Sequence, residues 1–418
     1  MKRIRIRNFG PIRVGFGDND GWMEIKKVTL MTGNQGAGKS TVAKLISTIS
    51  WIEKAIVRGD VSESHFLERG RFENHCEYQN IQEYFNQDTE IGYEGNMIKF
   101  SYLKGVCSIE LKTFVSIADY LMPKIMYVPA ERNFISAVRN LKNLKGLPGT
   151  IYTLGEEYVK AIQSIRGAVP LPINNVHLEY QRLNDIASIV GTDFKIRLMS
   201  ASSGFQSLVP LYIVSKYLAE SVIRARNYHA HSPNNDMSIA EREQLRDEIK
   251  TILDNPNLSD VAKQIQIELK SSRFEYGSFL NVVEEPEQNL YPVSQRQILN
   301  SLLELNNIMS SNLLVMTTHS PYLIYYLTLA IKAGLVYNEL SSNDANEGLI
   351  NEVLEIVPLK SFILPDELAI YELSEKDGSI SLLKTFKGIP SDDNNLNELL
   401  GDFNDLYSHL VNIQNKRK

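Results

Sequence analysis

The amino-acid sequence predicts an α/β fold with mixed β sheets and helical insertions. Two observations lead to this prediction. Near the N-terminus, a strand-like segment runs through a glycine-rich loop into a segment with helical spacing. Much later, residues 279–283 and 312–316 form continuous apolar runs, which are typical of parallel strands buried on both faces of a sheet. A chain of 418 residues with 43% hydrophobic residues is long for one compact domain, so one large domain with insertions or two domains are expected.

The N-terminal region carries the strand–loop–helix pattern. Residues 3–7 alternate Arg and Ile, the period of a strand with one inward face. Residues 23–31 are interpreted as a second strand, and the glycine-rich loop at 33–40 follows it. Helical spacing then extends over 41–58. This order of elements is the context that a phosphate-binding loop requires.

In the rest of the chain, changes in polarity separate the expected elements of the core from a surface insertion. The elements expected in the middle region are short strands at 97–103 and 125–128, a largely helical segment at 135–200, an amphipathic helix at 206–226, and helices at 241–253 and 260–269. The polar segment 227–275 is interpreted as a surface insertion, because it interrupts the core just before its next strand. The expected divisions are an N-terminal lobe at 1–134, a helical region at 135–275, a core part at 276–340 and a C-terminal α/β extension at 341–418.

Composition excludes several classes of protein. A net charge of −6 argues against a surface coated with phosphate-binding basic residues. The two cysteines, Cys76 and Cys107, are too few for a disulfide framework or a zinc site and fit a reduced, cytoplasmic protein. No apolar signal-peptide core follows the charged N-terminus. The most apolar stretch, 321–337, is interrupted by Lys332 and falls short of a membrane span, so no membrane association is expected.

The glycine-rich loop is the strongest motif. Its residues, with the one that follows, are Gly33, Asn34, Gln35, Gly36, Ala37, Gly38, Lys39, Ser40 and Thr41. Backbone N–H groups of such a loop converge on phosphates, and the following helix directs its positive end at them. Lys39 can reach the β- and γ-phosphates of a nucleotide, and the Ser40 hydroxyl can ligate Mg²⁺.

The apolar run at 279–283 delivers two acidic residues, Glu284 and Glu285, at its carboxyl end. Ligands bind at this end of the strands in open α/β sheets. One carboxylate can hold the magnesium shell, and the next can orient and deprotonate an attacking water. Two glutamates alone are typical of a solvated strand end, so the prediction depends on their occurrence together with the Lys39 loop.

Two further motifs complete the set. His319 follows the second apolar run and is expected at the same edge of the sheet, where it could contact the γ-phosphate and the water. Ser203, Gly204 and Gln206 open the amphipathic helix, and Ser203 with the helix N-terminus forms a second anion site. Considered alone, such a histidine is usually structural and such a serine is a common N-cap.

In this order, the four motifs resemble those of ABC ATPases. More narrowly, the chain resembles the ABC-type AAA family ATPases related to the OLD, RecF and SMC proteins, of the kind found in the Septu, PARIS and retron-associated anti-phage systems. The segments that carry this resemblance, which covers residues 1 to about 330, are 6–12, 127–132, 285–287, 290–292 and 318–321. The resemblance implies an ABC-type P-loop ATPase head and a cytoplasmic ATPase.

The resemblance also implies a head-to-tail homodimer, or a higher even-numbered oligomer, with ATP and Mg²⁺ between the subunits. Each nucleotide would touch the Lys39 loop of one chain and Ser203 and Gly204 of the other, with residues 289–290 in the loop that crosses the dimer. Lys39, Glu285 and His319 would be catalytic, and Ser40 and Glu284 would hold the metal. The chain departs from the family in two places. Glu284 stands where Asp is usual, and 128–131 has no glutamine, which leaves Glu131 as a substitute.

Three functions stay open. The favoured one is the ATPase subunit of a prokaryotic defence complex that controls a separate effector, often a nuclease, through partner surfaces at 135–200 and 227–275. No nuclease site is expected in this chain, because its acidic pairs at 392–393 and 402–405 fit solvated loops. The second is a RecF-like clamp that binds nucleic acid through a basic patch of Arg3, Arg5, Arg7, Arg132, Arg139, Lys142 and Lys145. A transporter ATPase fits least well. The chain lacks the heptad arms of an SMC-like rod.

Overall fold

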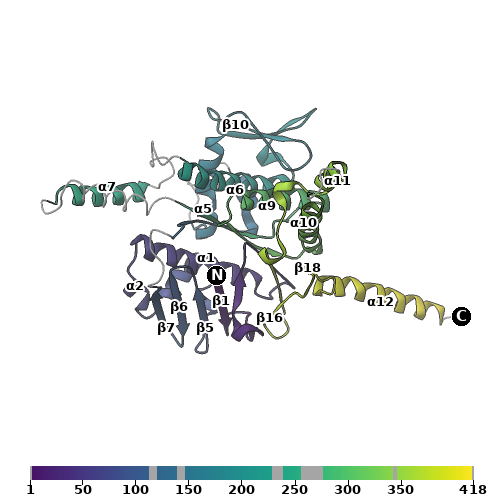
Figure 1. The fold of residues 1–418 in the computed structure, drawn as a ribbon, viewed down its shortest axis with the longest axis horizontal. Coiled ribbons are helices and arrows are strands. Elements are labelled where there is room, and N and C mark those ends of the chain that lie inside the picture. The colour runs from purple at the N-terminus through teal and green to yellow at the C-terminus, as the bar shows by residue number, and fades with distance from the viewer. Residues whose placement is uncertain are drawn as a thin grey trace.

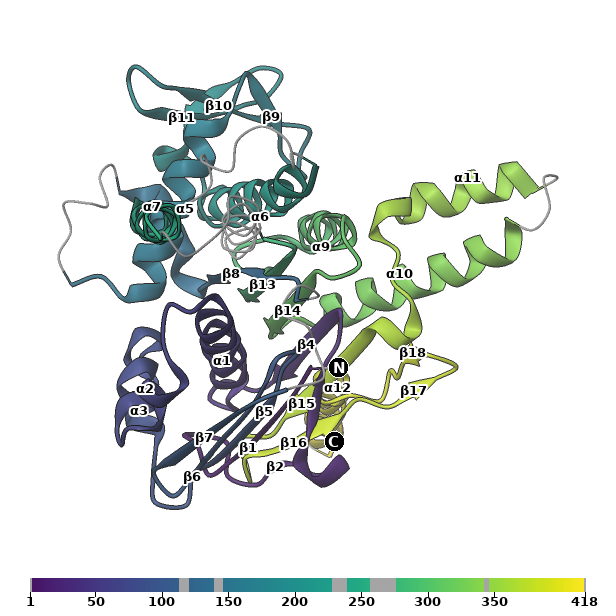
Figure 2. The ribbon, with the colours of Figure 1, turned by 60° about the vertical axis from the view of Figure 1, so that its left-hand side comes forward.

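The computed structural model describes residues 2–112, 120–138, 146–227, 239–255, 276–341 and 346–416. A helix near the N-terminus, α1 (Lys39–Arg58), lies between two β sheets, and further helices cover the opposite face of the larger sheet (Figure 2). The prediction of an α/β fold with mixed sheets and helical insertions is confirmed.

The larger sheet has seven strands in the order β2-β16-β15-β4-β14-β13-β8. Five neighbouring strands are parallel: β15 (Leu368–Leu373), β4 (Val28–Gly33), β14 (Leu313–Thr318), β13 (Ser278–Glu284) and β8 (Pro123–Val128). At one edge, β16 (Ser379–Leu382) pairs antiparallel with β15, and β2 (Gly15–Phe16) pairs with β16. Every residue of β13 is buried, which explains why its sequence is largely apolar. The parallel strands therefore end together at one carboxyl edge.

The smaller sheet is antiparallel and packs on the other side of α1. Its order is β3 (Met23–Ile25), β1 (Lys2–Arg7), β5 (Glu90–Glu94), β6 (Ile98–Leu103) and β7 (Val106–Leu111). The single strand expected at 23–31 is wrong. The chain leaves the smaller sheet after β3 and enters the larger one at β4, so two strands in different sheets replace it.

Helix α1 is buried over most of its surface because both sheets pack on it. Its Glu53 is fully buried and joins the helix to the smaller sheet. The carboxylate accepts hydrogen bonds from the backbone N–H of Met97 (2.6 Å) and from the Tyr93 hydroxyl (3.2 Å). These donors satisfy the buried carboxylate and so link α1 to the smaller sheet.

The opposite face of the larger sheet is covered by α5 (Gly149–Ser164), α6 (Ser203–Asn227) and α9 (Pro292–Asn307) (Figure 2). The helices predicted at 206–226 and 241–253 are confirmed as α6 and α7 (Ile239–Leu253). The strands predicted at 97–103, 125–128, 279–283 and 312–316 are also confirmed, within two residues at each start. The helix predicted at 260–269 lies outside the described residues.

The largely helical segment expected at 135–200 is wrong in its second half. After α4 (Asn133–Ala137) and α5, the chain forms a four-stranded antiparallel sheet: β9 (Ala168–Pro170), β10 (His177–Gln181), β11 (Ile186–Val190) and β12 (Lys195–Arg197). Asn175 and Asp185 turn the chain between these strands with φ of 52° and 51°, a conformation that Asn and Asp tolerate. Leu178 and Ile189 pair across the sheet and are fully buried.

The C-terminal part completes the larger sheet and then leaves it. Helices α10 (Pro321–Leu340) and α11 (Glu347–Ile356) project together, as Figure 2 shows. After the hairpin of β17 (Thr385–Phe386) and β18 (Ile389–Pro390), α12 (Asn395–Asn415) extends away from the body (Figure 1). Two short helices, α2 (Glu63–Leu67) and α3 (Arg71–His75), follow α1. Among the residues that the structure describes, no helix is both long and apolar enough to span a membrane.

Candidate nucleotide-binding site

The glycine-rich loop joins β4 to α1 at the carboxyl edge, and its glycines meet separate steric demands. Gly33 has a φ of 143°, and a Cβ there would lie 2.2 Å from the carbonyl oxygen of Leu373 on β15. Gly38 has a φ of 98°, and a Cβ there would lie 2.9 Å from Ile12. Since Gly38 is also the N-cap residue of α1, the helix N-terminus has no side-chain cap. An uncapped N-terminus of a long helix beside a lysine suits an anion.

Lys39 points into this loop and is only 6% exposed. Its ammonium donates hydrogen bonds to the carbonyl oxygens of Gly33 (2.8 Å) and Asn34 (3.0 Å). Burial lowers the pKa of Lys39 to about 8, against the opposing effect of nearby carboxylates, first Glu285 and then Glu287. The ammonium is thus partly stripped of water, which strengthens its attraction for a phosphate.

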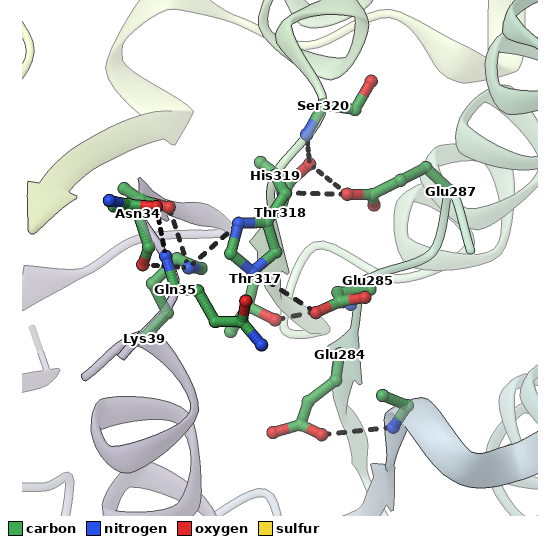
Figure 3. Close-up of polar contacts among 12 residues, drawn as sticks. Asn34, Gln35, Lys39, Glu284, Glu285, Glu287, Thr317, Thr318, His319 and Ser320 are labelled. Carbon is green, nitrogen blue, oxygen red and sulfur yellow. Dashed lines mark hydrogen bonds and ion pairs between the residues drawn. The ribbon is translucent and has the colours of Figure 1, made fainter. Parts of the chain in front are cut away.

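His319 lies between Lys39 and Glu285 (Figure 3). Its Nδ1 is 3.5 Å from the Lys39 ammonium, and its Nε2 is 3.4 Å from a carboxylate oxygen of Glu285. Burial, followed by the charge of Lys39, lowers the pKa of His319, so the imidazole is neutral at neutral pH. The neutral ring then accepts at Nδ1 from Lys39 and carries its proton at Nε2, facing Glu285. The structure therefore brings the three predicted catalytic residues together.

The backbone at Glu285 is held in an unusual conformation. Its φ is 43°, in the left-handed region that glutamate rarely adopts. The Glu285 N–H donates to the carbonyl oxygen of Thr317 (3.0 Å), and the Glu285 carbonyl oxygen accepts from the Arg132 guanidinium (2.6 Å). These contacts turn the chain sharply at the end of β13 and direct the Glu285 side chain toward His319.

Glu284 is directed instead toward β8 and the residues after it. Glu284 is 6% exposed, and its carboxylate accepts hydrogen bonds from the Tyr127 hydroxyl (2.5 Å) and the backbone N–H of Ala130 (3.1 Å). These two donors hold the carboxylate of the glutamate, which is one methylene longer than the usual aspartate. Ser40, the other predicted metal ligand, lies in the first turn of α1. Glu131, the candidate substitute for the missing glutamine, is exposed.

Glu287 is a site residue that the sequence interpretation did not single out. It lies in the turn after β13, and its carboxylate accepts hydrogen bonds from the Thr318 hydroxyl (2.7 Å) and the backbone N–H of His319 (2.9 Å). Burial raises the pKa of Glu287. These bonds fix the backbone that presents His319. In the sequence, only its position two residues after Glu285 could have identified Glu287 as a site residue.

The segment that opens α6 lies with the 289–290 loop. Ser203 is exposed, and a Cβ at Gly204 would lie 2.8 Å from the carbonyl oxygen of Asn289. The Gln206 side chain donates to the carbonyl oxygen of Met199 (3.0 Å). Both the start of α6 and the glycine-rich loop lie in the described part of the chain. Within one subunit, no hydrogen bond connects them. The two predicted anion sites are thus separate in the single subunit.

The structure contradicts the basic patch expected for a nucleic-acid clamp at one described member, Arg132. Arg132 is completely buried. Arg3 pairs with Glu94 (3.0 Å), and Arg5 pairs with Glu90 (2.7 Å), across β1 and β5. Arg7 lies 3.9 Å from the same Glu90. Arg139, Lys142 and Lys145 lie outside the described residues. Arg3, Arg5 and Arg7 along β1 therefore lie opposite glutamates on the neighbouring strand.

No family model and no curated protein matches the sequence. Solved structures give distant similarities. The SMC head domain from Thermotoga maritima has 11% identity and a TM-score of 0.37, and the match covers 92% of this chain and 98% of that one. An SMC head domain bound to the C-terminal domain of ScpA, from Pyrococcus furiosus, has 10% identity and a TM-score of 0.34, with both chains fully covered. A dimeric bacterial ABC transporter cassette has 12% identity and a TM-score of 0.27, with 92% and 100% covered. Similarity at this level does not define a function, which depends on the geometry of the site.

ATP affinity is expected to fall as pH rises above about 8. The pKa of Lys39 is about 8 without ligand. The negative charge of bound phosphates raises this pKa. Above pH 8, ATP binding therefore requires that Lys39 takes up a proton. Affinity should be flat below this pH and decline by up to about tenfold per pH unit above it. Titration of a fluorescent ATP analogue from pH 6.5 to 9.5 measures this. The Lys39→Arg variant is the control, because its guanidinium stays charged throughout. An equally flat profile for the wild type would contradict the assignment of Lys39 to the phosphates.

Proposed function

We propose that the protein is an ABC-type ATPase subunit that binds ATP with Mg²⁺, hydrolyses it, and forms a dimer around it. One observation carries this proposal: Lys39, His319 and Glu285 converge at the carboxyl edge, beside the uncapped N-terminus of α1. Such an edge is where α/β sheets bind ligands. The buried cation and the free helix end fit the phosphates, and the carboxylate fits the base.

In this proposal, each residue has a defined task. Lys39 and the backbone of residues 33–41, with Gly36 and Ala37 at the bend, bind the phosphates. Glu285 orients the attacking water and accepts its proton, while the Nε2–H of His319 faces the Glu285 carboxylate and holds it in place. When bound, Mg²⁺ neutralises charge on the phosphates of ATP.

Ser40 and Glu284 are the residues proposed to hold Mg²⁺, and their chemistry fits this ion. Both offer oxygen ligands, which Mg²⁺ prefers. Each oxygen of Glu284 accepts one hydrogen bond, from Tyr127 or Ala130, and keeps further acceptor capacity. Since Mg²⁺ retains several waters, Glu284 is proposed to act through a water of the metal shell.

The dimer is proposed from the second anion site. Ser203 and Gly204 stand at the exposed start of α6 and are separate from Lys39 in the subunit. A head-to-tail partner would place them, with Gln206, against the phosphates bound by the first subunit. Because Gly204 packs closely against Asn289, the 289–290 loop is proposed to lie at the same interface.

The ATPase is further proposed to act in the cytoplasm as part of an anti-phage complex and to control a separate effector, such as a nuclease. The resemblance to defence ATPases supports this role, and α12 supports the existence of a partner. Leu406, Tyr407 and Leu410 on α12 are each 64–65% exposed, an unusual display of large apolar side chains. Within the described residues, no group of three or more His, Cys, Asp or Glu side chains lies close enough together to hold a metal ion.

The function can be tested by the native mass of the protein co-expressed with its flanking genes, in ATP and Mg²⁺. We expect an even number of copies of this chain with a second protein. A bare ATP-dependent dimer that also binds plain duplex DNA, with an affinity that falls steeply with salt, would favour the clamp instead. The ion pairs of Arg3 and Arg5 make weak DNA binding the expected result.

A further inference from the structure

Arg132 is a completely buried arginine whose guanidinium bonds to backbone carbonyl groups. Its Nη1 donates to the carbonyl oxygens of Glu284 (2.6 Å) and Pro129 (3.3 Å). Its Nη2 donates to the carbonyl oxygen of Glu285 (2.6 Å), and its Nε to that of Ser207 (3.2 Å). One planar side chain thus spans three elements: the turn after β8, the end of β13 and the first turns of α6.

These contacts join the two anion sites. Ser207 lies one turn after Ser203 on α6, the helix whose start is proposed to meet the partner's ATP. Glu285 is the proposed base of the subunit's own ATP, and its carbonyl group is held by the same guanidinium in a strained φ of 43°. A shift of α6 therefore acts on the Glu285 backbone through one rigid group rather than through a chain of side chains.

We propose that Arg132 is a positioning residue that links the start of α6 to the backbone of Glu285, so that engagement of the partner's nucleotide by Ser203 aligns the subunit's own base. This inference rests on the proposed function. It makes hydrolysis at one ATP dependent on closure at the other, and it gives a reason for a buried cation that contacts neither the glycine-rich loop nor a surface.

The geometry of arginine is needed for this role. A guanidinium has five N–H donors in a fixed plane. Here it makes four hydrogen bonds, each to a different carbonyl group. A lysine has three donors on one nitrogen and cannot reach both Ser207 and the two glutamate carbonyl groups together. Burial lowers the pKa of Arg132 to about 10, so the side chain stays charged at neutral pH.

The Arg132→Lys variant tests the link through steady-state kinetics. We expect kcat to fall about 100-fold, as displacement of a base by about 1 Å typically causes, while KM for ATP changes less than about twofold. The matched control is Ser136→Ala, because the Ser136 hydroxyl also bonds to a carbonyl group near the start of α6 (Gln206, 2.8 Å) without touching β13. Its kcat should stay close to the wild type. Equal kcat in Arg132→Lys and Ser136→Ala would overturn the inference.

A double variant separates positioning from general damage. If Arg132 acts through Glu285, adding Arg132→Lys to Glu285→Gln should cause no further loss of turnover. Multiplication of the two losses would contradict the link. A purely structural role for Arg132 would instead lower the melting temperature and raise KM as well as reducing kcat.

Hydrogen exchange of the wild-type chain tests the link if the lysine variant does not fold. With ATP and Mg²⁺, peptides covering 203–210 and 284–288 should gain protection together, and in Ser203→Arg both gains, including that of the wild-type 284–288 segment held by Arg132, should be lost. Protection of 284–288 that persists in Ser203→Arg would overturn the link. Failure of the wild type to bind or hydrolyse ATP would instead remove the proposed function, so the two failures are distinguishable.

Discussion

Replacement of Glu285 by glutamine is expected to leave ATP binding intact and to reduce turnover by about 10²–10⁴-fold, the usual contribution of a general base. The amide has the shape of the carboxylate and keeps the backbone bonds to Thr317 and Arg132, but it cannot accept the proton of the attacking water. His319 would still face the side chain, so the loss would belong to the base and not to a rearranged site. Phosphate release measures turnover, and a fluorescent ATP analogue measures binding.

The control for this variant is Glu110→Gln, which makes the same chemical change on the exposed surface of β7. Its turnover should equal that of the wild type. Turnover in Glu285→Gln that matches the control would remove Glu285 from the role of base.

Replacement of Ser203 by arginine is expected to block ATP-dependent dimer closure without weakening ATP binding to the monomer. Ser203 is exposed at the start of α6, so the larger side chain fits the free subunit. In the proposed dimer the arginine side chain would occupy the space of the phosphates bound by the partner, and we expect dimer affinity to fall by up to about 100-fold, because overpacking a close contact typically costs about 1–3 kcal/mol.

Sizing chromatography with and without ATP and Mg²⁺ measures this effect. Ser108→Arg, on the exposed side of β7, introduces the same side chain away from both anion sites and should dimerise like the wild type. Unchanged closure in Ser203→Arg would show that α6 does not contribute to the interface.

The elements that could be predicted from the sequence are those that a single periodic signal determines. The buried run of β13 and the glycine-rich loop before α1 are examples, because parallel strands and phosphate loops constrain every residue in them. The sheet of β9–β12 was missed because its strands have three to five residues and mixed polarity, too short for a period-2 pattern to emerge. The transfer of the chain between sheets after Ile25 leaves no pattern in the apolar residues either.

The sequence named the residues of the candidate site, but their contacts could not be predicted from it. The motifs named Lys39, Glu285 and His319, and in the structure His319 lies 3.5 Å from the Lys39 ammonium and 3.4 Å from the Glu285 carboxylate. The proposed role of Arg132 could not be predicted from the sequence. An arginine that bonds only to backbone carbonyl groups has no partner side chain that would identify its contacts. Its position just after an apolar strand was compatible with an exposed basic patch, and only burial excludes that interpretation.

The central claim is that two copies of this chain close around shared ATP, and the native mass of the Glu285→Gln variant tests it most directly. Slow hydrolysis should hold this variant in the closed state, so the mass should correspond to one chain without nucleotide and to two chains with ATP and Mg²⁺. The same measurement on Glu285→Gln with Ser203→Arg should return a single chain. A mass that stays at one chain while ATP is bound at saturation would contradict the sandwich, and with it the shared use of Lys39 and Ser203.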